Sequence, residues 1–153
     1  MLSMILLVSL TLNSAIFQAQ EKPQARVILE FRLVESSSSE GLKKVTLEGT
    51  SEELYLHKDV IISNKDVVAA RPIPSLVPNS FDIEIEFSKE GSKKISRAST
   101  ENIGKRIAIL IDGKAIVAPV VRSTISHKAV IAGRAPSFTR EEAEELARKI
   151  IAP

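Results

Sequence analysis

The chain has 153 residues, of which 44% are hydrophobic and 26% are charged, which is enough for one domain with its own core. Basic and acidic residues are interspersed and the formal net charge is only +2, so charge gives no support for binding to nucleic acid. The sequence has no cysteine, which excludes a disulfide scaffold, thiolate metal ligands and a cysteine nucleophile.

The N-terminal residues have the composition of an export signal. Residues 1–20 carry no charged side chain, and an apolar run over residues 4–12 is followed by polar Asn13 and Ser14 and then by the small residues Ala15 and Ala19. We predict a signal peptide over residues 1–19, cut between Ala19 and Gln20, and a mature domain over residues 20–153. The alternative is an uncleaved short anchor, although a spanning helix needs about 20 apolar residues.

The location follows from this leader. A cleaved leader predicts an exported protein in the periplasm or outside the cell. An uncleaved leader predicts a domain anchored to the inner membrane and facing outward, which touches the membrane only through that leader.

Alternation of apolar and polar residues predicts strands in the first part of the mature chain. Residues 26–34 read as a strand with one buried face. Shorter strands around residues 45–47 and 53–57 are expected to form a hairpin. Residues 64–70 read as a short helical turn capped by Asn64. After this turn we expect no regular element before Asn79, because three prolines interrupt the chain: Pro72, Pro74 and Pro78.

Residues 81–87 show the cleanest strand pattern, with apolar side chains on one face and three carboxylates on the other. A strand buried on both faces would not tolerate those carboxylates, so we expect a sheet with one solvated side. Pairing of this acidic face with the basic side chains of Arg26 and Arg32 would place the two strands side by side.

A helix is predicted from its cap at Ser88 to about residue 103, ending before Gly104. The next two apolar runs flank Asp112-Gly113, a dipeptide that favours a tight hairpin turn because both positions adopt positive φ. Pro119 cannot donate to a sheet, so it marks an edge, a bulge or the end of the returning strand.

Two further elements complete the prediction. Residues 129–132 form a short strand closed by Gly133. A last helix begins at Thr139, which forms a capping box with Glu142 and precedes an apolar stripe. The predicted fold is α+β: a single antiparallel or mixed sheet with two main helices packed on one face.

Candidate chemical groups are sparse. His57 and His127 have no neighbours at metal-ligand spacing, and no nucleophile motif or glycine-rich phosphate loop is present. We therefore predict a protein that is not an enzyme and uses neither a cofactor nor a metal.

Several motifs recur in the order found in one family. Asn102-Ile103-Gly104-Lys105 precedes Asp112-Gly113-Lys114 and Ala118-Pro119. Further on, Phe138-Thr139 is followed by Glu141-Glu142-Ala143 and Leu146-Ala147. This run resembles the periplasmic P1 head subdomain of the SecD protein-export component. The resemblance implies the head fold, a periplasmic setting and contact with unfolded polypeptide.

Two departures from the family pattern limit what the resemblance implies. Residues 134–137 are inserted before Phe138, and the sequence stops at Pro153, where SecD continues into transmembrane helices. Proton-driven translocation is therefore not carried over.

The leading hypothesis is a non-enzymatic exported module that binds protein or peptide, with a possible role in protein export. Its candidate contact surfaces are a basic helix side, formed by Lys93, Lys94 and Arg97, and the proline-rich segment from Pro72 to Pro78. Solvated side chains and a plain connector are the simpler interpretations of these two features. A membrane-anchored sensory or structural domain is the second hypothesis, and a hydrolytic or metal enzyme is the third.

Overall fold

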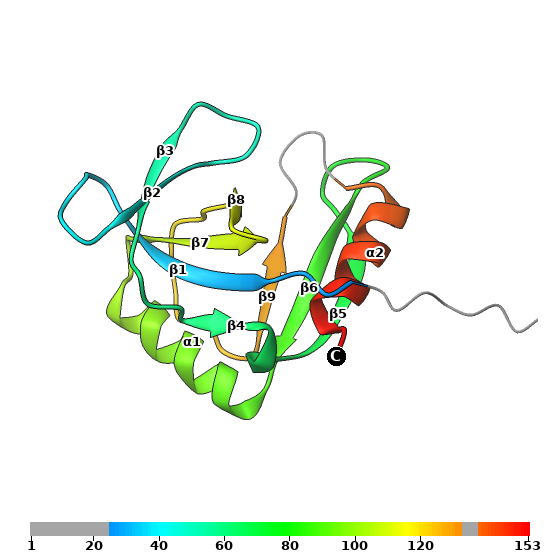
Figure 1. The fold of residues 1–153 in the computed structure, drawn as a ribbon. Coiled ribbons are helices and arrows are strands. Elements are labelled where there is room, and N and C mark those ends of the chain that lie inside the picture. The colour runs from blue at the N-terminus through cyan, green and yellow to red at the C-terminus, as the bar shows by residue number, and fades with distance from the viewer. Residues whose placement is uncertain (1–24, 133–137) are drawn as a thin grey trace, which may run out of the picture.

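The computed structural model describes residues 25–132 and 138–153 (Figure 1). The strands are β1 Leu29–Glu35, β2 Lys43–Thr46, β3 Glu53–Leu56, β4 Ile62–Ser63, β5 Val67–Pro74, β6 Phe81–Phe87, β7 Arg106–Ile111, β8 Lys114–Val117 and β9 Lys128–Ile131. The helices are α1 Lys89–Glu101, α2 Arg140–Ile151 and the 3-10 helix η1 Asn64–Asp66.

The strands divide between two sheets. The larger sheet has the order β2-β3-β1-β7-β8, with β4 also paired to β1, and the smaller sheet has the order β5-β6-β9. All pairings between these strands are antiparallel, so the α+β class with antiparallel strands and two helices is confirmed. The prediction of a single sheet is wrong, because alternation along one strand does not reveal which strand pairs with it.

The larger sheet curls until its two end strands meet. Leu47, just after β2, bridges to Ala115 of β8, and the backbone N–H of Glu48 donates to the Ala115 carbonyl at 2.8 Å. The apolar side chains enclosed by this curl form a small core of their own: Val34, Leu47, Leu54, Leu56, Ala108, Leu110, Ala115 and Ala118. Strand β7 is consequently buried on both faces, which explains its continuous apolar sequence.

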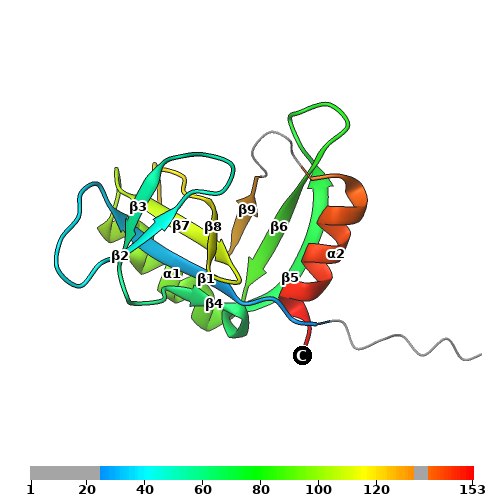
Figure 2. The same cartoon turned by 45° about the horizontal axis from the view of Figure 1, so that its top comes forward.

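The main core lies between the two sheets and the helices (Figure 2). Ile83 and Ile85 of β6 share this core with Ile95 of α1 and Ala143 of α2. Both helices contact β6, so the expected packing of two helices on one face holds for the smaller sheet. The opposite face of β6 carries its three carboxylates, as predicted.

These carboxylates do not pair with Arg26 or Arg32, and that prediction is wrong. Glu84 pairs with Arg71 of β5 and, at 3.1 Å, with Lys128 of β9, its two strand neighbours. Arg32 lies in the other sheet and pairs with Glu30 at 2.9 Å.

The segment after β4 also differs from the prediction. Ser63, not Asn64, is the cap of a helix that ends at Asp66, and β5 follows at once and includes Pro72 and Pro74. A strand can hold these prolines because β5 is an edge strand, whose outward backbone positions need no hydrogen-bond donor.

Unlike the predicted cap at Asn64, the predictions made from Ser88, Gly104, the Asp112-Gly113 turn and Thr139 are confirmed. The Ser88 hydroxyl caps α1 by accepting from the N–H of Gly91 at 3.0 Å, and Gly104 after the helix has φ +85°. Asp112 and Gly113 both have positive φ in the turn between β7 and β8. Thr139 and Glu142 form the capping box of α2.

Candidate functional site

An apolar groove lies between the edges of the two sheets. It has a volume of about 310 Å³, and we call it the inter-sheet groove. Strands β1 and β7 form its floor, the chain after β8 forms one wall and β9 forms the other. Its lining residues are Phe31, Ile107, Ile109, Pro119, Val120, Val121, Arg122, Ser123, Ile125, Lys128, Ala129 and Val130.

The wall after β8 is held in place by backbone hydrogen bonds to β7 and its lead-in. The N–H of Ile107 donates to the Pro119 carbonyl at 3.1 Å, and the N–H of Val121 donates to the Lys105 carbonyl at 2.8 Å. Further along, the hydroxyl of Ser99 in α1 accepts from the N–H of Ile125 at 2.9 Å. The wall therefore has a fixed position although it is not a regular strand.

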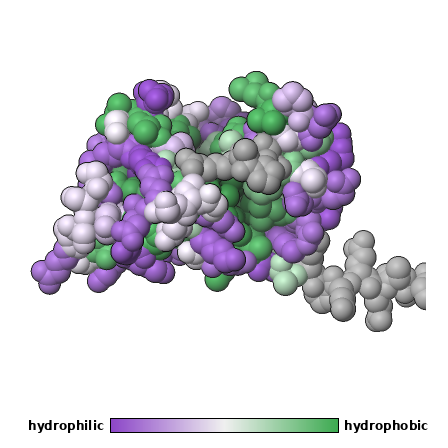
Figure 3. Space-filling model, turned by 90° about the horizontal axis from the view of Figure 1, so that it is seen from above, coloured by the Kyte–Doolittle hydropathy of each residue, from purple (hydrophilic) through white to green (hydrophobic). Residues whose placement is uncertain are grey.

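The groove keeps apolar side chains in contact with solvent. Val120 on one wall is 43% exposed and Val130 on the other is 45% exposed. Seen from above in Figure 3, apolar surface shows in the middle of the molecule and in separate patches along the upper edge of the view, among hydrophilic surface. A pair of opposed, exposed valines on fixed walls suits an apolar ligand.

Two cations lie at this groove. Lys128 pairs with Glu84 at 3.1 Å, whereas Arg122 has no ion-pair partner within the described residues. In the described part of the chain, the positive charge of Arg122 is therefore available to a ligand.

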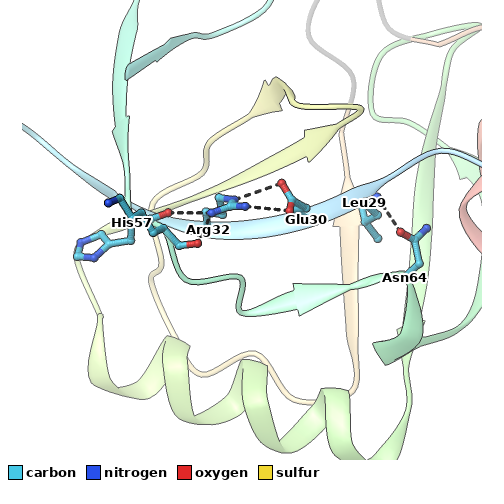
Figure 4. A network of polar contacts seen from close by, with 6 residues as sticks. Leu29, Glu30, Arg32, His57 and Asn64 are labelled. Carbon is cyan, nitrogen blue, oxygen red and sulfur yellow. Dashed lines mark hydrogen bonds and ion pairs between the residues drawn. The ribbon is translucent and has the colours of Figure 1, made fainter. Parts of the chain in front are cut away.

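Asn64 joins segments that lie far apart in the sequence. Its Oδ1 accepts from the N–H of Leu29 at 2.9 Å, as Figure 4 shows. Its Nδ2 donates to the carbonyls of Val27 and Ile150, both at 2.9 Å. One side chain therefore joins the start of β1, the junction between the sheets and the end of α2.

The same view shows the partners that Arg32 has in place of the acidic face of β6. Its guanidinium lies along β1 between the Glu30 carboxylate and the carbonyl of His57, which it reaches at 3.2 Å. It also donates to the carbonyl of Lys58. Arg32 thus fixes the chain that leaves β3.

The three basic residues singled out on α1 all have acidic partners. Lys93 pairs with Glu90 at 3.0 Å and Arg97 with Glu101 at 3.0 Å, both along the exposed helix surface. Lys94 reaches Asp66, whose side chain is only 5% exposed, at 2.6 Å. Lys94 thus contributes to the packing of α1 on η1.

The three prolines are also separated by the fold. Pro72 and Pro74 lie in β5, while Pro78 lies in the hairpin loop between β5 and β6. They do not line the inter-sheet groove.

The histidines occupy strand ends. His57 Nε2 lies 2.8 Å from Glu35 Oε1, and Lys105 Nζ lies 3.1 Å from the same oxygen. Hydrogen bonds from His57 and then Lys105 hold the pKa of Glu35 below its ordinary value. His127 contacts Ser126.

Within residues 25–132 and 138–153, no group of three His, Cys, Asp or Glu side chains could hold a metal ion. Neither helix of that part of the chain is long and apolar enough to cross a bilayer.

The motif residues behind the family resemblance hold turns and caps. Gly104 follows α1, Asp112-Gly113 makes the β7–β8 turn, Pro119 follows β8, and Thr139 and Glu142 cap α2. Gly133, Ala19 and Gln20 lie outside the described residues.

Comparison with known families decides the assignment. The model of the SecDF P1 head subdomain matches residues 32–152. The chain belongs to the SecDF P1 head family. The resemblance stated from its motifs is thereby confirmed.

Relatives of this P1 head chain are protein translocase subunits. The SecDF subunit of Thermus thermophilus is 32% identical over 147 residues, covering 80% of this chain and 18% of that protein. The SecD subunit of Aquifex aeolicus is 42% identical over 65 residues, covering 42% of this chain and 12% of that protein. The P1 head chain therefore spans less than a fifth of the length of each of these relatives.

Solved structures share the fold. The crystal structure of SecDF in its super-membrane-facing form matches with a TM-score of 0.67 and 27% identity, over 84% of this chain and 19% of that one. A structure of SecDF described as a membrane component that enhances protein export matches with a TM-score of 0.65 and 27% identity, over 84% of this chain and 64% of that one.

Sequence reasoning missed the walls of the groove. Val120, Arg122 and Val130 belong to short segments that read as ordinary loop or strand. Only the meeting of two sheet edges makes them neighbours, and alternation along either segment carries no sign of it.

Proposed function

We propose that this P1 head domain binds unfolded polypeptide during protein export and catalyses no reaction of its own. The observation that carries this proposal is the inter-sheet groove, whose walls expose Val120 and Val130 beside Arg122, a cation with no ion-pair partner among the described residues. Membership of a family whose full-length members are translocase subunits supports a role in export.

An extended apolar segment suits the shape of the groove. Globular proteins bury most of their apolar side chains, so a site lined by valine and isoleucine favours chains that have not yet folded. A volume of about 310 Å³ holds a few side chains, so the interaction is expected to be weak and reversible. Weak and reversible binding suits a polypeptide that must be released again during export.

The ionisable side chains support a binding role over a catalytic one. In the described part of the chain, Lys128 and Arg122 are the ionisable residues that line the groove, and no histidine or carboxylate lies there to act as a general base. The His57–Glu35 pair lies at the far end of β1 and does not line the groove.

We also propose that the domain acts outside the cytoplasm, carried there by residues 1–19. Mass spectrometry of the protein isolated from its native host tests this location. A mature chain that begins at Gln20 supports a cleaved leader, and an intact Met1 supports an anchor. Recovery of the intact chain in the cytosolic fraction would contradict both.

Val120→Ser tests the groove as the binding site. The change removes two exposed methyl groups from one wall, at about 0.8 kcal/mol for each buried carbon, so we expect binding of an unfolded secretory protein to weaken about tenfold. Fluorescence anisotropy of the labelled polypeptide measures the affinity.

Val68→Ser is the matched control. Val68 is 59% exposed on β5, away from the groove lining, and its change should leave the affinity as it is. Equal effects of the two substitutions, or no saturable binding to the unaltered chain, would refute the proposed function.

A further inference from the structure

The structure assigns a mode of recognition to the groove: an extended polypeptide segment with an acidic residue adds to the free edge of β9 as a new strand. This inference rests on the proposed function and specifies how the same site would work. Three features support it: the direction of the β9 backbone groups, the prolines on the opposite edge of the same sheet, and the positive charge of Arg122 beside the groove.

Three consecutive residues of β9 line the groove: Lys128, Ala129 and Val130. Side chains alternate between the two faces of a strand, so a groove lined by successive residues lies along the strand's edge. Among the described strands, β9 pairs only with β6, which leaves the edge at the groove without a partner strand.

The pairing with β6 shows which backbone groups point to that edge. The N–H of Phe87 donates to the carbonyl of His127 at 2.9 Å, and the register continues through Ile85 opposite Ala129. In an antiparallel pair, hydrogen-bonded positions alternate with positions that turn their N–H and C=O away. Lys128 and Val130 therefore direct their backbone groups toward the groove.

The other edge of the same sheet is closed by proline. The register places Pro72 opposite Ile83 and Pro74 opposite Phe81, at the positions whose backbone groups turn away from β6. Proline has no N–H to offer, so an added strand would find no donor at these two positions. The equivalent outward positions of β9 carry Lys128 and Val130, which keep theirs.

In the larger sheet, the two end strands β2 and β8 meet at Leu47 and Ala115. An extended polypeptide repeats N–H and C=O groups at the spacing of a strand. Its backbone can therefore pair with the N–H and C=O groups that β9 directs toward the groove. Arg122, without an ion-pair partner in the described part of the chain, favours a segment that carries a carboxylate. The backbone groups of β9 and the charge of Arg122 together favour an extended polypeptide with an acidic residue as the ligand of the groove.

The test introduces into β9 a proline like those that remove N–H donors from the outer edge of β5. Val130→Pro removes one outward N–H, and the control Val130→Thr keeps the N–H and the shape of the side chain. The probe is a soluble peptide of about six residues, the usual length of a strand, in which valine alternates with threonine and one aspartate. Titration calorimetry on the 153-residue chain measures its binding.

We expect the proline variant to bind about three- to tenfold more weakly than the threonine variant, the effect of one lost backbone hydrogen bond. Circular dichroism and thermal unfolding of both variants check that the proline variant still folds. A second measurement uses the unaltered protein, with the peptide N-methylated at one backbone position at a time. Strand addition predicts losses at alternate positions, and a lysine in place of the aspartate should weaken binding.

The outcomes separate the two proposals. Binding that is insensitive to both Val130→Pro and peptide N-methylation would overturn strand addition while leaving a polypeptide-binding groove. Absence of binding by both the peptide and an unfolded secretory protein would overturn the proposed function itself.

Discussion

At the scale of single residues, Asp66 joins η1 to α1. Its buried carboxylate accepts from Lys94 at 2.6 Å and from the N–H of Ser63 at 3.0 Å. The helix comes so close that a Cβ added to Gly91 would lie 2.4 Å from the Asp66 carbonyl oxygen. Glycine at this position therefore permits the approach, although it weakens the helix itself.

Asp66 also makes the stability of the domain depend on pH. Burial acts to raise the pKa of Asp66, but hydrogen bonds from Lys94 and Ser63 outweigh it, and the pKa lies below the ordinary 3.8. The folded state thus binds this proton less readily than the unfolded state does. The stabilisation is present above the unfolded-state pKa and is lost as the pH falls through the folded-state pKa.

We expect the unaltered chain to lose more unfolding free energy than Asp66→Asn between about pH 6 and about pH 3. Urea unfolding at several pH values measures the difference. The other acidic residues are common to both chains, so the comparison isolates Asp66. Lys94→Met, which removes the main partner, should also flatten the profile, and parallel profiles for all chains would show that this carboxylate has no such role.

At the scale of elements, local rules predicted the caps of both α-helices and the tight turn after β7, and failed where an element depends on its neighbours. The α2 capping box and the Asp112-Gly113 turn involve residues close in sequence, so their geometry follows from the residue types. Strand β5 reads as an irregular segment because of Pro72 and Pro74, and it becomes a strand only as the edge partner of β6.

Strand β7 shows the reverse case. The sequence correctly predicted a strand at this apolar run, but it did not predict that both faces of the strand are buried. One face meets the main core through Ile107 and Ile109, and the other meets the small core through Ala108 and Leu110. The second core exists because β2 and β8 close over it, a contact between segments far apart in sequence.

At the scale of the whole molecule, the relation between the two sheets determines the width of the groove. Asn64 lies at the junction, where it accepts from Leu29 and donates to Val27 and Ile150. Its amide satisfies one N–H and two carbonyl groups, which is close to the capacity of an asparagine side chain. We infer that this residue holds the start of β1 and the end of α2 against η1.

Asn64→Ala should therefore lower the unfolding free energy by about 2–4 kcal/mol, since partly buried backbone groups lose their partners. Chemical denaturation measures this change. Asn102→Ala is the control, because the Asn102 amide makes a single hydrogen bond, to the Ala98 carbonyl at the end of its own helix. A loss at Asn64 no larger than the loss at Asn102 would contradict the assigned role.

The residue order alone was sufficient for the α+β class, most strand and helix positions, and the family, because alternation, capping and short motifs act over a few neighbouring residues. Folding in three dimensions decided that there are two sheets, that α1 directs Lys94 to Asp66, and that Val120 and Val130 line one groove. Each of these depends on contacts between distant segments, whose pairing is selected by the free energy of the complete core.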